Sequence, residues 1–63
     1  MGYKIKEVRE SLKMTQEELA SKSGVSRGTI SALENGKKRT TSVKTLKNIA
    51  SALGTTVSQI FFE

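Results

Sequence analysis

The sequence predicts an all-α fold, a compact bundle of five short helices. Apolar residues recur at helical spacing in five segments, and no segment shows the features of a strand. Proline is absent, and the glycines, Gly28 excepted, fall at the ends of these segments, where a left-handed residue ends a helix. At 63 residues the chain is expected to form a single domain, residues 1–63.

The first predicted helix spans about residues 3–13, and the second begins at Thr15. Apolar residues of the first lie three or four positions apart, on one helical face. In the second, Thr15 and Glu18 are spaced as a capping box, in which each side chain bonds the other residue's backbone amide. Gly24 can take the left-handed conformation that ends this helix.

Three more helices are predicted in the second half of the chain. The third begins after Ser26, a good N-cap, and ends at residues 35–36, Asn-Gly. The fourth spans about 43–53, and a short fifth follows Thr56. Helical spacing assigns these apolar residues of the later four helices to the core: Leu19, Ile30, Leu33, Leu46, Ile49, Leu53 and Ile60.

The net charge of +5 comes entirely from residues 37–47, which carry five cations and no acid. The rest of the chain has six cations against six acids. The five cations are Lys37, Lys38, Arg39, Lys44 and Lys47. A concentrated basic segment indicates a polyanionic partner, most often nucleic acid and less often an anionic membrane. Charge alone leaves open a solvated lysine-rich loop.

Catalysis and metal binding have little support in the composition. The chain lacks His, Cys and Asp, so its hydroxyls have no base beside them and the common zinc sites are excluded. Neither a metal, a cofactor nor a small-molecule ligand is expected. The longest apolar run, residues 60–62, is far too short to cross a membrane, and residues 1–7 lack the apolar core of a signal peptide. We therefore expect a cytoplasmic protein that is not an enzyme.

A very short turn containing Gly24 joins the second and third predicted helices, which favours a helix-turn-helix. Ala20 provides a small side chain where two such helices touch. In a helical-wheel projection of the third helix, Ile30 and Leu33 face inward and small residues face outward. The outward residues are Gly28, Ser31, Ala32 and Asn35.

The glycine on this outward face has two explanations. Inside a helix glycine is about 1 kcal/mol less favourable than alanine. A bare helix face lets the backbone approach another surface closely, so Gly28 is a candidate for the point where the helix enters a DNA groove. The alternative is that Gly28 is a tolerated imperfection near the start of the helix.

The chain resembles the phage repressor and Cro-type regulators, the Cro/C1 or XRE family. The resemblance is carried by TQEELASKSGVSRGTISALENG. Toward the N-terminus it extends over IKEVRESLKMTQEELA, which overlaps the start of this stretch. Toward the C-terminus it extends over ISALENGKKR, which overlaps the end of the stretch, and over TLKNIASALGTTVSQIF. It implies a lambda-repressor-like DNA-binding domain of five helices that binds operator DNA, usually as a homodimer.

The resemblance also implies roles for individual residues. Positions near the base edges, with Ser31 added from the outward face, are Ser26, Arg27, Gly28, Thr29, Ser31 and Ala32. Positions facing the phosphates, with the capping Thr15 added, are Thr15, Gln16, Asn35, Lys37, Lys38, Arg39, Thr40 and Thr41. Arg9 and Glu34 match a pair that in several members forms an internal ion pair.

Arg27 is the only long side chain at the base-contacting end, because Gly28 and Ala32 stand where several family members carry glutamine or other polar residues. Arginine can bond guanine O6 and N7 together in the major groove. The methyl groups of Thr29 and Ala32 can contact a thymine methyl. DNA shape and deformability are expected to supply other parts of the specificity.

The sequence thus predicts a sequence-specific regulator of transcription, a repressor, that binds double-stranded DNA. Helix 26–35 would enter the major groove of a pseudo-palindromic operator, and two copies would span two half-sites. The alternative is an antitoxin-type or regulatory module whose main partner is another protein. Membrane-surface binding is disfavoured, because basic and apolar faces do not coincide on one long helix. Candidate dimer contacts are Val57, Ile60 and Phe62.

Overall fold

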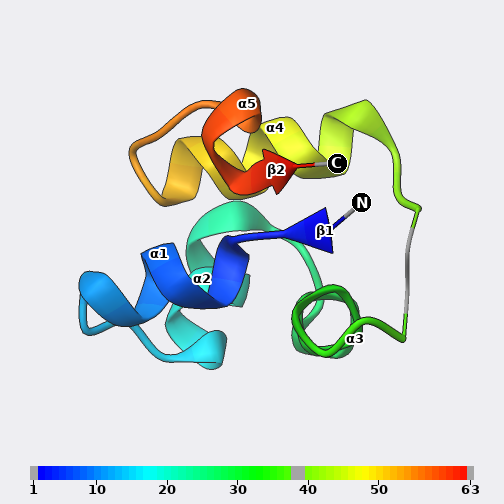
Figure 1. Ribbon diagram of the computed structural model, residues 1–63. Coiled ribbons are helices and arrows are strands. Elements are labelled where there is room, and N and C mark those ends of the chain that lie inside the picture. Colours follow the sequence, from blue (N-terminus) through cyan, green and yellow to red (C-terminus); the bar gives the residue numbers. More distant parts are fainter. Residues whose placement is uncertain (1, 38–39, 63) are drawn as a thin grey trace.

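Five helices and one pair of short strands make up the fold of residues 2–37 and 40–62, the part of the chain described by the computed structural model. In chain order the elements are β1 (Gly2–Tyr3), α1 (Ile5–Ser11), α2 (Gln16–Ser23), α3 (Arg27–Glu34), α4 (Val43–Ala52), α5 (Val57–Ile60) and β2 (Phe61–Phe62). Each helix lies within the segment predicted for it, so the five-helix fold class is confirmed. In Figure 1, α4 and α5 lie on one side of the molecule and α1, α2 and α3 on the other.

The core lies between these two groups of helices. All seven residues that helical spacing assigned to the core are buried, and Ile5 of α1 joins them at 0 % exposure. Leu19 of α2 and Ile49 of α4 are likewise at 0 %, and α2 packs against α4, so the two groups of helices are in direct contact. Burying a large apolar side chain contributes about 1.5–3 kcal/mol. The core therefore fixes the position of α3 through its inward residues, Ile30 and Leu33.

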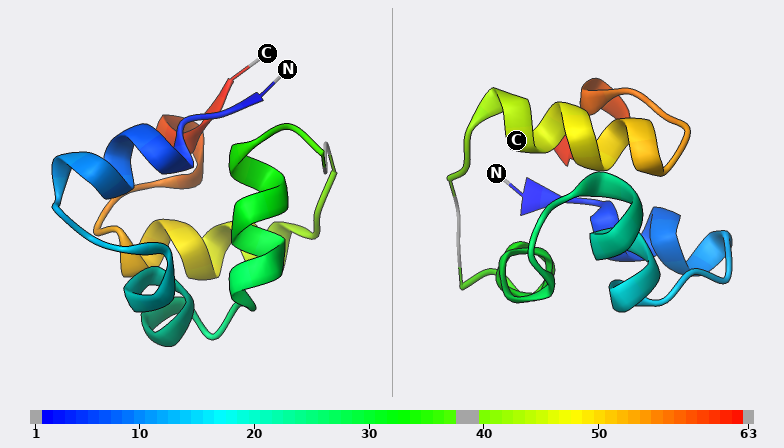
Figure 2. Two further views of the ribbon diagram at one scale, coloured as in Figure 1. Left: turned by 90° about the horizontal axis from the view of Figure 1, so that it is seen from below. Right: turned by 180° about the vertical axis from the view of Figure 1, so that it is seen from behind.

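The two ends of the chain pair as strands, which the sequence analysis did not predict. β1 and β2 are antiparallel, with Gly2 opposite Phe62 and Tyr3 opposite Phe61. Figure 2 shows the two termini side by side. The rings of Tyr3 and Phe61 pack with their centroids 5.5 Å apart. Strands of two residues are too short to show the alternation by which a strand is detected in a sequence.

The start and end of α2 follow the predicted signals. The Glu18 amide donates to the Thr15 hydroxyl at 3.0 Å, and the Thr15 amide donates to the Glu18 carboxylate at 2.9 Å, which completes the capping box. These bonds hold the pKa of Glu18 below its ordinary value. At the other end Gly24 has φ 71°, the left-handed conformation that ends the helix and turns the chain toward α3.

Lys13 has a positive φ of 55°. Within residues 2–37 and 40–62 it is the one residue other than glycine with a positive φ. It closes the end of α1, where the Lys13 amide donates to the Glu10 carbonyl and the Met14 amide donates to the Arg9 carbonyl. The left-handed conformation costs an L-residue about 1–2 kcal/mol, and glycine adopts it freely.

We expect Lys13→Gly to raise the free energy of unfolding by up to about 1 kcal/mol, because relief of this strain exceeds the entropy lost by glycine. Denaturation by urea measures the change. The matched control is Lys22→Gly inside α2, which should lower stability by about 1 kcal/mol. Equal losses at both positions would show that Lys13 is not strained.

Candidate nucleic-acid interface

The helix-turn-helix is built from α2, the turn at Gly24, and α3. In the left panel of Figure 2, α3 runs along the page while α2 is seen more nearly end-on, so the two helices cross steeply. Ala20 is half-buried and packs against the core. Ser26 caps α3, where its hydroxyl accepts from the Thr29 amide at 3.2 Å and donates to the Thr29 hydroxyl at 2.8 Å.

The outward face of α3 is open. Gly28 is exposed, and beyond its chain neighbours and its own helix backbone, a Cβ atom built on it would meet no described atom within 4 Å. Ser31 and Ala32 are half-buried on the same face, and Asn35 is exposed beyond its end. Nothing in the described fold requires glycine at position 28, because it has neither a positive φ nor a close neighbour.

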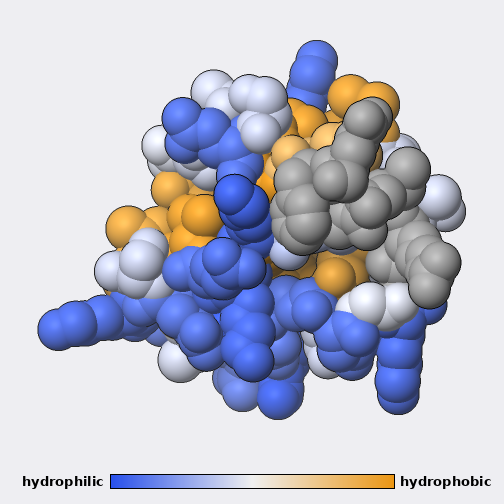
Figure 3. Space-filling view, viewed as in Figure 1, coloured by the Kyte–Doolittle hydropathy of each residue, from blue (hydrophilic) through white to orange (hydrophobic). Residues whose placement is uncertain are grey.

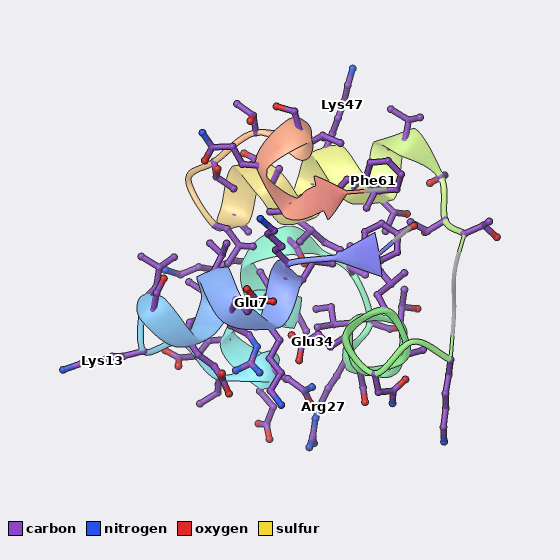
Figure 4. The ribbon with its side chains drawn as sticks, viewed as in Figure 1. Glu7, Lys13, Arg27, Glu34, Lys47 and Phe61 are labelled. Carbon is purple, nitrogen blue, oxygen red and sulfur yellow. The ribbon has the colours of Figure 1, made fainter. Side chains whose placement is uncertain are left out.

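Arg27 stands at the exposed tip of α3, with 63 % of its side chain accessible to solvent. Figure 4 shows it pointing away from the body of the protein, on the side opposite α4 and α5. Its Nη1 lies 3.5 Å from Oε1 of Glu17 in the first turn of α2, and the Glu17 side chain is 77 % exposed. Exposed pairs of this kind contribute at most about 1 kcal/mol, so the guanidinium is free to bond elsewhere.

Behind this surface, Arg9 of α1 and Glu34 of α3 form a buried ion pair, the arrangement that the family resemblance implies. Arg9 Nε donates to Oε2 of Glu34 at 2.8 Å and Nη2 donates to Oε1 at 3.1 Å, while Nη1 donates to the Met14 carbonyl at 2.7 Å. Their side chains are only 10 % and 4 % exposed. The hydrogen bond to Glu34 raises the pKa of Arg9 above its ordinary value. This pair connects α1 to α3.

Gln16, expected to contact a phosphate, also bonds to this pair. Its Nε2 donates to Oε1 of Glu34 at 3.0 Å, and the residue is half-buried. Two depressions flank it, of about 390 and 290 Å³. Each is lined by a further cation: Lys6 of α1 lines the smaller, and Lys13, just after α1, lines the larger. The amide group has a second N–H that this bond does not use.

Lys6 and Lys13 line these depressions but were not predicted as members of this surface. Their charges were balanced against the acids when the net charge of the whole chain was summed. Lys6 lies three residues before Arg9 in α1, so a helical wheel places the two on one face. Lys13 follows the end of α1 with a positive φ, so no helical period could have placed it.

The loop after α3 lies only partly within the described residues. Lys37 is exposed, and its amide donates to the Asn35 side chain at 3.0 Å. Thr40 is exposed and Thr41 half-buried, whereas the expected phosphate contacts Lys38 and Arg39 lie outside the described residues.

Lys47 of α4 points away from the molecule on the side opposite Arg27 (Figure 4). Among the residues that the structure describes, Arg27, Lys37 and Lys6 are cations on or beside α3, whereas Lys47 is not. In Figure 3 hydrophilic residues cover the lower part of the face shown, over α1, α2 and α3.

Among the candidate dimer contacts, the prediction that Ile60 contacts a partner is wrong. Its exposure is 0 %, because α5 packs it into the core of its own subunit, and no surface is left for a partner. Val57 is half-buried against the same core. The backbone of Phe62 belongs to β2, but its side chain lies outside what the structure describes.

Hydroxyl side chains cap three of the helices, whereas Thr56 at the start of α5 makes no side-chain cap bond. Thr15, Ser26 and Ser42 each accept a hydrogen bond from a backbone amide at the start of a helix.

Within residues 2–37 and 40–62, no group of three or more acidic, cysteine or histidine side chains is arranged to hold a metal ion. None of the helices in that part of the chain has the length and apolar character needed to span a bilayer.

Comparison with known proteins identifies the family. A helix-turn-helix family model matches residues 5–60, from the start of α1 to the end of α5. The chain belongs to the helix-turn-helix family of XRE type. It is thus a domain of the kind found in DNA-binding transcriptional regulators. The resemblance seen in the sequence is confirmed.

A relative from Bacillus subtilis (strain 168), an uncharacterized HTH-type transcriptional regulator called RghRB, is 42 % identical over 52 residues. The match covers 82 % of this chain and 37 % of the relative, so the chain spans well under half of that protein's length. No solved structure matches the chain.

Proposed function

We propose that this helix-turn-helix domain binds double-stranded DNA with α3 in the major groove and represses transcription in the cytoplasm in a sequence-specific manner. The observation that carries the proposal is the open, small-residue face of α3. The major groove is about 12 Å wide and admits a helix of this diameter. A helix with Gly28 and Ala32 on its outer face can lie deeper in the groove than one with long side chains.

Around this helix, the proposed phosphate contacts lie on both sides. The N-terminus of α2, with Thr15 and Gln16, presents amide N–H groups and the positive end of a helix dipole. At the other end of α3, the proposed contacts are Asn35, Lys37, Thr40 and Thr41. Phosphate contacts of this kind hold a protein in register on the duplex, while base contacts give specificity. Ser26, Thr29 and Ser31 complete the proposed base-contacting set with Arg27.

Selection of bound duplexes from a random pool at moderate salt tests the proposal. We expect enrichment of a pseudo-palindrome whose half-sites are centred about one helical turn apart. Binding that is equally weak for all sequences, and that becomes strong only with a second protein, would favour the alternative of a protein-interaction module.

Gly28→Phe separates the groove contact from folding. We expect the variant to fold normally, because the position faces open space, but to bind the selected duplex at least about tenfold more weakly, since a ring cannot fit between the α3 backbone and the floor of the groove. Fluorescence anisotropy with a labelled duplex measures affinity, and thermal unfolding checks the fold. Unchanged affinity would place α3 outside the groove.

We further propose that two copies bind as a homodimer and that Phe62 contributes to their contact, with Val57 nearby. Phe62→Asp should weaken self-association, because a charge would replace an apolar side chain in the contact. Sedimentation velocity over a range of concentrations measures this, on the selected duplex and free in solution. The same sedimentation profile for the wild type and for Phe62→Asp would exclude Phe62 from any subunit interface.

A further inference from the structure

Glu17 is an acid on a surface that is proposed to face a polyanion. Three acids lie on the two helices of the helix-turn-helix: Glu17, Glu18 and Glu34. The Glu18 carboxylate bonds the Thr15 amide at the start of α2, and Glu34 is buried against Arg9. The remaining carboxylate, that of Glu17, is exposed and lies beside the Arg27 guanidinium at 3.5 Å.

The contact between Glu17 and Arg27 contributes little to the fold. Both side chains are more than half exposed, and exposed pairs add little to stability. An acid beside DNA also repels phosphates. Since the contact does not serve the stability of the domain, its geometry is better explained by what it does to the arginine.

The guanidinium has donors to spare for two partners. It carries five N–H groups in a planar fork, and Glu17 accepts from Nη1 alone. The four remaining N–H groups include a parallel pair that fits O6 and N7 of guanine. A carboxylate on one edge restricts the rotation of this long side chain and so lowers the entropy cost of placing its other edge against a base.

We propose that Glu17 is a positioning residue that orients Arg27 for the recognition of guanine. This inference rests on the proposed function, in which α3 lies in the major groove. Glu17 acts on specificity in two ways: it favours the orientation of Arg27 that meets guanine, and its charge weakens binding wherever that contact is not made. The residue therefore raises discrimination while lowering affinity for DNA in general.

The test compares Glu17→Gln with the wild type on the selected duplex and on duplexes changed at each base pair, at one fixed salt concentration. We expect Glu17→Gln to bind the changed duplexes more tightly and to lose up to about fivefold of the preference for guanine at one position, the limit for an exposed ion pair. Glu7→Gln on α1 removes the same charge away from Arg27 and should leave every preference unchanged (Figure 4).

A second comparison uses Arg27→Ala as the background. There Glu17→Gln should no longer change the preference at any base pair, because the arginine through which it acts is absent. Equal tightening on all duplexes, in both backgrounds, would show that Glu17 only repels phosphates and would overturn the inference. A wild type that prefers no duplex would instead overturn the proposed function, and the selection experiment detects this outcome first.

Discussion

Arg9→Met is expected to lower the free energy of unfolding by about 3–5 kcal/mol, the usual cost of removing one partner of a buried ion pair. Among residues 2–37 and 40–62, the variant leaves the Glu34 carboxylate, 4 % exposed, with the Gln16 amide as its one hydrogen-bond partner. It also leaves the Met14 carbonyl without the donor it has in the wild type. Small domains have about 5 kcal/mol of stability, so the variant should be largely unfolded at room temperature or slightly above.

Urea denaturation followed by circular dichroism measures this loss. Lys6→Met changes an exposed cation of the same helix and should cost less than about 0.5 kcal/mol. The double variant Arg9→Met, Glu34→Leu removes both charges and should recover a large part of the loss, because no unpaired charge stays buried. If the double variant is as unstable as the sum of its single changes, the two residues do not act as a pair.

The charge of Arg9 in this pair should not be lost as pH rises through the usual range of measurement. A group with a raised pKa stabilises the fold fully below its unfolded-state pKa and loses this contribution only as pH rises through the folded-state value. The pKa of Arg9 is raised above its ordinary value, which already lies beyond the pH range in which proteins are studied. The arginine therefore stays charged in both states at every pH at which the domain is studied.

Arg27→Ala is expected to cost about 1–3 kcal/mol on the selected duplex and to relax the preference at one base pair of each half-site. The fold should be unaffected, because the side chain is 63 % exposed and its pair with Glu17 is weak. Affinities for the full set of single base-pair changes measure the effect.

Lys37→Ala is the matched control for Arg27→Ala. Lys37 is an exposed cation placed beside the proposed groove contact. Its loss should weaken all duplexes alike and lower the salt slope by about one. If Arg27→Ala behaves in the same way, Arg27 contacts a phosphate and not a base.

Local signals in the sequence were enough to predict the helices. Thr15 and Glu18 form the capping box because it requires only a spacing of three residues, and Gly24 ends α2 because glycine reaches positive φ without strain. The inward positions of α3 followed from the helical period, which also gave its open outer face.

Contacts between distant segments could not be predicted in this way. The pairing of β1 with β2 depends on where the two ends of the folded chain meet. Ile60 was expected both in the core and at an interface, and only the packing of α5 decides between them. The contact of Glu17 with Arg27 joins residues on different helices, and its existence depends on how steeply α2 and α3 cross.

Chemical-shift changes in the amide NMR spectrum, followed while the selected duplex is added, test the central claim most directly. We predict the largest changes at Gly28, Ser31 and Ala32 on α3 and at the N-terminus of α2, with little change on the exposed face of α4. Large changes over α4 and α5, with the α3 amides unmoved, would contradict the proposal that α3 enters the major groove.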